Sequence, residues 1–118
     1  MRKNNKFEKT NMHIVRQFSN GLRKKREGVY FNSISGSNAQ MLYIKLEPGV
    51  PTYHSHPNEQ LGYILSGEIE LMINGESFVC KPNDAYCIPP NLEHGFKVLN
   101  NKAAEYLEIF SPIKEENI

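Results

Sequence analysis

The sequence predicts an all-β fold, built as a β-sandwich or a β-barrel. Short stretches in which apolar and polar residues alternate with a period of two recur along the chain, for example at 39–47 and 68–73. Turn signals separate them at the spacing typical of sandwiches and barrels. No segment longer than about ten residues shows helical periodicity. The length of 118 residues predicts one domain.

Charge is unevenly distributed, although the net charge is only +1. Nine of the 14 basic residues but only two of the 13 acidic residues lie in the first 30 positions. A basic arm can favour nucleic acid or an anionic surface, but no DNA-binding motif accompanies it. We interpret residues 1–11 as a flexible polar arm and the basic stretch that follows as solvated loop. We expect no nucleic-acid partner.

No targeting or membrane segment is predicted. The N-terminus lacks the apolar region of a signal peptide, and no apolar run approaches the roughly 20 residues that span a bilayer. We therefore expect a cytoplasmic protein without a membrane partner. Cys80 and Cys87 should then be reduced, each behaving as a small hydrophobic residue of a strand.

The first expected strands lie at 13–18, 28–33 and 39–47, separated by Asn20-Gly21 and a polar loop at 35–38. In the third of these strands the alternation places Leu42, Ile44 and Leu46 together on one side. Pro48-Gly49 ends this strand. The barrel domain is expected to span residues 12–113, followed by a polar tail at 114–118.

A strand at 61–65 has apolar residues on both faces and ends at Ser66-Gly67, where glycine can adopt positive φ. The next stretch, 68–73, alternates again and is followed by Asn74-Gly75, a strong signal for a type I′ hairpin. That hairpin predicts a partner strand at 77–80. The last expected strands lie at 85–88, 94–99 and 103–110.

Histidines and one amide form a candidate metal site. His54 and His56 are two residues apart, so on a strand both side chains would lie on one face. Gln60 follows four residues later and offers a carbonyl oxygen. His94, after the proline-rich loop at 89–91, is a candidate fourth ligand. Spacing to Gly67 favours Gln60 as the oxygen donor, but Glu59 remains an alternative.

This set of donors suits one divalent transition metal ion: zinc, nickel, iron, cobalt or manganese. Because all four donors are neutral, the charge of the ion would stay uncompensated. Such an ion acts as a Lewis acid toward a carbonyl or anionic oxygen. If Glu59 were the ligand instead, two histidines and a carboxylate would favour the chemistry of a non-haem iron oxygenase.

These motifs resemble those of cupins, small double-stranded β-helix (jelly-roll) barrels. The first cupin motif matches Gly49, His54, His56, position 60 and Gly67, with glutamine in place of the usual glutamate. The second motif matches Asn83-Asp84, Pro89, Asn91 and His94, with asparagine at both glycine positions, where positive φ is still accessible. The resemblance covers residues 39–112 and implies a single-domain cupin barrel.

Within the cupins, HSHPNEQLGYILSGEIE and the tail EIFSPIKEE are most similar to the pectin-degradation branch, the KdgF type. That resemblance implies three histidines and a glutamine as metal ligands. It also implies a ring-opening isomerase that converts 4,5-unsaturated uronate monosaccharides into linear 5-keto-4-deoxyuronate. The catalytic positions of the branch correspond to Glu108, Phe110 and Lys114. Glutamate replaces the usual aspartate, and lysine replaces an arginine that could grip a carboxylate with two nitrogens.

Three functions are therefore expected, in decreasing order. The first is a metal-dependent enzyme that opens or isomerises such an unsaturated uronate or a related small acidic sugar. The second is a metal-dependent binding or sensor protein without turnover, and the third is an oxygenase. Because small cupins commonly pair through their sheets, we also expect a homodimer, in which the strand at 13–18 could extend a partner's sheet.

Overall fold

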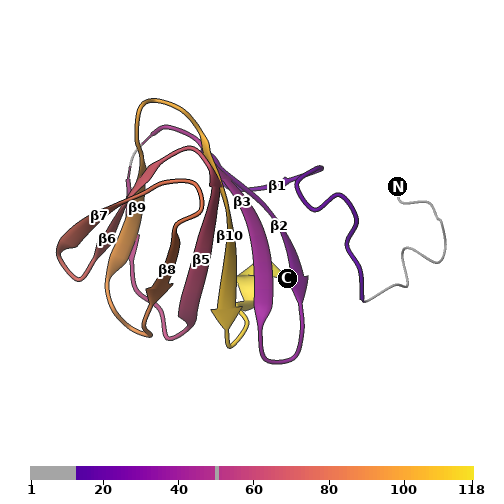
Figure 1. Ribbon diagram of the computed structural model, residues 1–118. Helices are drawn as coiled ribbons and strands as arrows, with labels where there is room; N and C mark the ends of the chain where they lie inside the picture. The colour runs from indigo at the N-terminus through magenta and orange to yellow at the C-terminus, as the bar shows by residue number, and fades with distance from the viewer. Residues whose placement is uncertain (1–12, 50) are drawn as a thin grey trace.

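The computed structural model describes residues 13–49 and 51–118 and consists of two antiparallel β-sheets (Figure 1). The flexible arm expected at 1–11 lies outside the described residues. The strands are β1 Arg23–Arg26, β2 Val29–Ser35, β3 Gln40–Leu46, β4 Thr52–His54, β5 Glu59–Ser66, β6 Ile69–Ile73, β7 Glu76–Cys80, β8 Ala85–Ile88, β9 His94–Val98 and β10 Ala104–Ser111. A 3₁₀ turn, η1, spans Glu115–Asn117.

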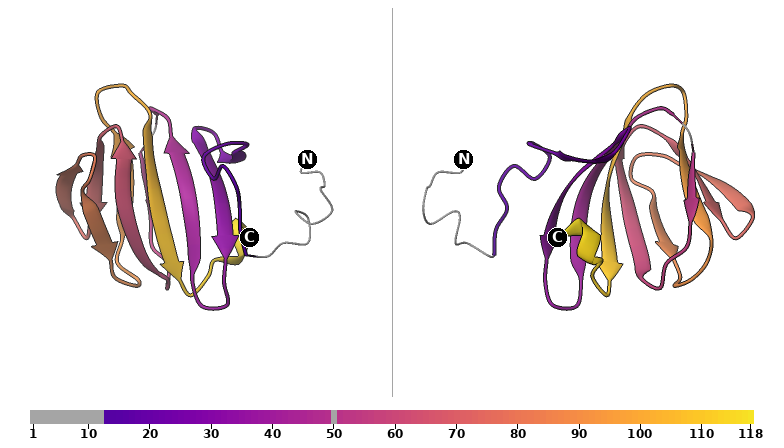
Figure 2. Two further views of the ribbon diagram at one scale, coloured as in Figure 1. Left: turned by 45° about the vertical axis from the view of Figure 1, so that its right-hand side comes forward. Right: turned by 180° about the vertical axis from the view of Figure 1, so that it is seen from behind.

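The larger sheet has the strand order β1-β2-β3-β10-β5-β8, and the smaller sheet has the order β4-β9-β6-β7. Figures 1 and 2 show the two sheets facing each other, with the C-terminal turn beside β10, β3 and β2. This is the all-β jelly-roll barrel that the sequence predicts. Strands that are distant in sequence become neighbours. Side chains as far apart in sequence as His54 and Glu108 can therefore meet inside the barrel.

Side-chain alternation decides which residues form that interior. On β3, Leu42, Ile44 and Leu46 are buried, as expected, while Met41 is exposed. β10 alternates in the same way, with Tyr106 and Phe110 buried. The remaining buried apolar residues come from both sheets and pack into one core. Removal of their apolar surface from water stabilises the fold.

The predicted turns adopt the left-handed backbone conformations that their asparagine and glycine residues favour. Asn74 and Gly75 have φ values of 48° and 87°, which are those of a type I′ hairpin between β6 and β7. Asn83 and Asn91, which stand at the two motif glycine positions, have φ values of 77° and 68°. Asparagine therefore supplies the left-handed conformation there.

Two segments differ from the expectation. Residues 13–18 do not form a strand, because only two apolar residues precede Arg16 and the stretch pairs with no neighbouring strand in the described chain. The basic stretch 23–26 is not a loop but strand β1, which pairs with β2. The tail is packed against the barrel, with Asn117 fully buried.

Both cysteines are free thiols, with Cys80 buried in the core and Cys87 exposed. None of the helical structure in the described residues is long or apolar enough to cross a bilayer.

Candidate functional site

Three histidine side chains meet inside one end of the barrel. His54 ends β4, His94 begins β9, and the two are directly paired in the smaller sheet. His56 lies two residues past β4, so the irregular chain, not strand alternation, directs its side chain inward. One ring nitrogen from each histidine lies within 4.8 Å of the other two. The described residues of this cluster include no carboxylate group.

Backbone carbonyls fix the protonation of two of these rings. His94 Nδ1 lies 2.9 Å from the Leu92 carbonyl oxygen, and His56 Nδ1 lies 3.0 Å from that of Asn58. A carbonyl oxygen can only accept, so both Nδ1 atoms carry the proton. In the neutral rings each Nε2 atom is then unprotonated and offers a free lone pair. His94 Nε2 is buried and has no hydrogen-bond partner among the described residues.

Gln60 adds an oxygen to these nitrogens. It belongs to β5 of the larger sheet and is only 2 % exposed. Its Nε2 donates to the Glu108 carboxylate at 2.5 Å, which turns Oε1 toward His56 Nε2, 3.0 Å away. Two acceptor atoms thus face each other across a short gap, an arrangement that a cation between them would stabilise. Glu59, the alternative ligand, is exposed on the opposite face of β5.

The environment keeps the histidines neutral. Burial, followed by the nearby charges of His94 and Lys114, lowers the pKa of His54 to about 4. Burial also lowers the pKa of His56 and that of His94. Neutral imidazoles are the form that binds metal ions. The orphaned Nε2 atom of His94 and the inward-facing oxygen of Gln60 therefore fit a divalent transition metal.

A cavity of about 270 Å³ reaches His54 of the cluster and passes between the two sheets. Its wall includes His54, Gln60, Glu108, Phe110 and Lys114, so the structure brings the expected catalytic positions to the expected metal ligands. Apolar residues of β2 and β3 form much of the remaining wall. Such a mixture of apolar walls and a few converging polar groups is typical of small-molecule sites.

Glu108 is a buried acid, only 3 % exposed, in the middle of β10. Tyr86 and Gln60 both donate to its Oε2 at 2.5 Å, which leaves Oε1 for a ligand in the cavity. Burial raises the pKa of Glu108 to about 7, against the opposing effect of these two donors. A carboxyl group whose pKa lies close to neutral pH can both take up and release a proton.

Tyr86 reaches Glu108 through a gap that Gly62 leaves. In the larger sheet Gly62 lies opposite Glu108 on one side and opposite Tyr86 on the other. A Cβ atom at position 62 would come within 2.0 Å of the Tyr86 ring. The contact of Tyr86 with Glu108 was not predicted from the sequence, in which the available signal was a glycine at an inward position of a strand.

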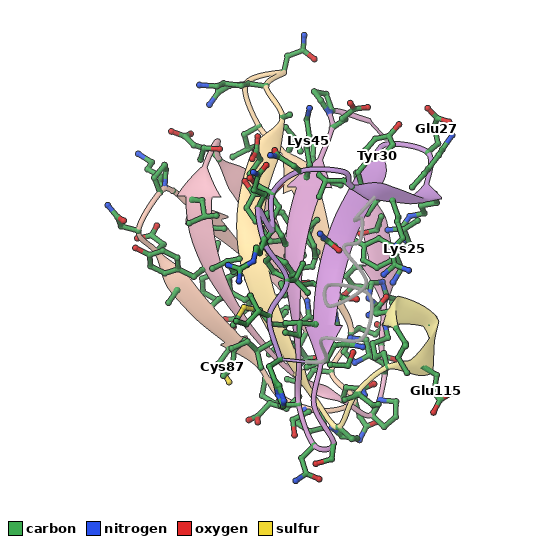
Figure 3. The ribbon with its side chains drawn as sticks, turned by 90° about the vertical axis from the view of Figure 1, so that its right-hand side faces the viewer. Lys25, Glu27, Tyr30, Lys45, Cys87 and Glu115 are labelled. Atoms are coloured by element: carbon green, nitrogen blue, oxygen red, sulfur yellow. The ribbon has the colours of Figure 1, made fainter. Side chains whose placement is uncertain are left out.

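Lys114 lies at the mouth of the cavity, with its ammonium group 5.2 Å from the centre of the Phe110 ring. Gln40 fixes the lysine backbone by donating to the Lys114 carbonyl at 3.1 Å. Lys25 and Arg26 of β1 line the same cavity, and sequence reasoning missed both, because it treated their stretch as solvated loop. Figure 3 shows Lys25 on the side of β1 next to the C-terminal turn.

The chain is similar to known proteins in sequence and in fold. The pectin degradation protein KdgF of Dickeya dadantii is 33 % identical over 64 residues, which are 53 % of this chain and 57 % of that protein. The chain thus matches little more than half the length of this curated relative. The structure of KdgF from Halomonas sp. superposes with a TM-score of 0.81 at 21 % identity, covering 90 % of this chain and 98 % of the other.

An RmlC-like cupin from Shewanella frigidimarina superposes with a TM-score of 0.77 at 21 % identity, covering 88 % and 97 % of the two chains. These likenesses support the fold. The family model of the cupin domain matches residues 42–110 of this chain. This segment includes all four candidate ligands and Glu108. With the jelly-roll barrel and the histidine cluster, this match shows that the chain belongs to the cupin family.

Proposed function

We propose that this protein is a metal-dependent enzyme that opens 4,5-unsaturated uronate monosaccharides into linear 5-keto-4-deoxyuronate. The observation that carries the proposal is the row of contacts from Tyr86 through Glu108 to Gln60, which links a buried acid with a pKa near 7 to the histidine cluster. The likeness to a pectin degradation protein supports the class of substrate.

His54, His56, His94 and Gln60 would hold the ion. When bound, a divalent metal supplies Lewis-acid stabilisation of negative charge that develops on a sugar oxygen. Tyr86 and Gln60 keep one oxygen of Glu108 occupied, so a single oxygen is directed at the substrate. Lys114 supplies a positive charge for the carboxylate of the sugar.

The reaction is an isomerisation in which protons balance. The hydroxyl group at C1 loses its proton, the bond between C1 and the ring oxygen breaks, and C1 becomes a carbonyl carbon. The ring oxygen becomes the C5 ketone as the C4–C5 double bond takes up a proton at C4. Glu108 is proposed to receive the first proton and to return one at C4, which is general acid–base catalysis.

The test is incubation of metal-loaded protein with unsaturated galacturonate and with unsaturated guluronate, following the absorbance of the 4,5-double bond. We expect this absorbance to disappear faster than in the enzyme-free reaction. Glu108→Gln should keep the metal but lose about 10²- to 10⁴-fold in rate, the range typical of a lost acid–base group. Native protein that does not exceed the spontaneous rate on either substrate would refute the proposal.

A further inference from the structure

We propose that Lys25 and Lys114 together form the carboxylate-binding subsite of the cavity, and that Glu116 occupies this subsite until the acid group of a ligand displaces it. The inference rests on the proposed function and deepens it. It assigns the residues that recognise the charged end of a uronate, and both lie outside the segment that matches the cupin domain, Lys25 on β1 and Lys114 in the C-terminal tail.

The two ammonium groups converge on a single carboxylate oxygen. Lys25 Nζ lies 3.0 Å and Lys114 Nζ 3.6 Å from Glu116 Oε2. The three residues line the same cavity as His54 and Glu108. The structure thus already contains a carboxylate bound between these lysines, at the mouth of the candidate active site.

Burial distinguishes the fixed members of this group from the exchangeable one. The side chains of Lys25 and Lys114 are 24 % and 15 % exposed, whereas that of Glu116 is 59 % exposed. Lys25 is also held by buried Asn117, whose Oδ1 accepts from Lys25 Nζ at 2.6 Å. Lys114 is held against the face of Phe110. The cations are therefore positioned by the barrel, and the acid is the member that can leave.

Two lysines can replace one arginine here. A single ammonium group is a point charge and cannot grip both oxygens of a carboxylate, as a guanidinium can. Two ammonium groups that approach from different segments, Lys25 from β1 and Lys114 from the C-terminal tail, can contact both oxygens. Once Glu116 leaves, Lys25, Lys114 and the neighbouring Arg26 give the mouth of the cavity an excess of positive charge. That charge is complementary to an anionic sugar and not to a neutral one.

The test measures binding of a probe that cannot react. Metal-loaded protein is titrated calorimetrically with galacturonate, which lacks the double bond, and with neutral galactose. Lys25→Gln retains an N–H donor for Asn117 but loses the charge, and it should weaken galacturonate binding about 3- to 10-fold, as expected for a partly buried ion pair. Lys24→Gln is the matched control: Lys24 pairs with Glu27 and is not part of the cavity wall, so its loss should change nothing.

The second arm removes the internal competitor. Glu116→Gln should tighten galacturonate binding about 2- to 5-fold, because the binding-competent state no longer has to displace a carboxylate. Glu115→Gln is its control, since Glu115 is exposed and points away from the barrel in Figure 3. Unfolding temperatures of all four variants show whether the tail remains packed, and Lys25→Arg should restore binding.

Galacturonate affinity that is unchanged in Lys25→Gln, or that falls equally for galactose, would overturn the subsite. Unchanged affinity in Glu116→Gln would overturn the role of Glu116 as occupant. If Lys25→Gln weakens galacturonate binding but the native protein turns over no unsaturated uronate, the subsite stands and the proposed reaction fails. If turnover occurs and KM is the same in Lys25→Gln as in the native protein, the reaction stands and the subsite fails.

Discussion

At the scale of single residues, the chemistry of the site depends on which atom of each side chain is left without a partner. The Nδ1 atom of His94 donates a hydrogen bond to the Leu92 carbonyl oxygen, whereas its Nε2 atom is buried and has no partner among the described residues. Leaving a buried polar atom unpaired costs about 1–3 kcal/mol, so its retention implies a compensating ligand. The sequence identified the residue types, but only the fold shows which nitrogen faces the cluster.

Metal binding should therefore depend on these histidines and on no others. His54→Ala and His94→Ala are each expected to lose the metal during dialysis, because only three of the four proposed donors remain to hold the ion. His54→Ala is the cleaner variant, since His54 as a whole residue is exposed although its ring nitrogen is packed in the cluster, and its truncation therefore leaves no cavity in the core. Elemental analysis of the purified proteins measures the effect.

His13→Ala is the control, because His13 lies outside the cluster. It should retain the metal content of the native protein. Full metal content in both site variants would contradict the proposed ligand set.

At the scale of elements, the sequence predicted most strands because their buried and exposed residues alternate. β3, β6 and β8 lie within a residue of the expected ranges. β1 could not be predicted in this way: all four of its residues are basic, so it has no apolar period, and its pairing with β2 is what makes it a strand. Conversely, 13–18 has apolar residues but no neighbouring strand to pair with in the described chain.

The candidate site follows the same rule. Motif spacing identified the histidines and Gln60, which the fold brings together. Lys25, Arg26 and the contact of Tyr86 with Glu108 could not be predicted, because they depend on neighbours that are distant in sequence. Gly62 shows why: its role is to leave room for a ring from β8, and nothing within β5 itself requires it.

Gly62→Ala should accordingly destabilise the protein by about 1–3 kcal/mol, the usual cost of inserting atoms into a packed interior. The added Cβ would displace the Tyr86 ring and separate its hydroxyl group from Glu108. Urea unfolding gives the change in stability, and turnover of the unsaturated uronate should fall in the same variant.

Gly49→Ala provides the comparison, because nothing lies within 4 Å of a Cβ built there and the backbone is not left-handed. Its free energy of unfolding should stay within about 0.5 kcal/mol of the native value, as for ordinary surface changes. Equal stability of the two variants would show that the close approach of Tyr86 to Gly62 is not required.

At the scale of the whole molecule, the site joins the two sheets of the barrel. His54 and His94 belong to the smaller sheet, whereas Gln60 and Glu108 belong to the larger one. A bound ion would therefore connect strands of the two sheets directly, in addition to the packing of their side chains in the core. The homodimer remains a prediction, and the strand at 13–18 that was expected to extend a partner's sheet is absent from the structure.

An ion that bridges the two sheets should stabilise the folded protein, because the four donors are not assembled in the unfolded chain. At a free metal concentration of 100 times Kd, the stabilisation is about 2.7 kcal/mol. For a domain of this size that corresponds to a rise in Tm of roughly 10 °C. Thermal unfolding with added metal, and again with a chelator, measures the shift, and the double variant His54→Ala/His94→Ala should show none. Native protein that carries one ion per chain and yet unfolds at the same temperature with and without the chelator would show that the ion does not hold the sheets together.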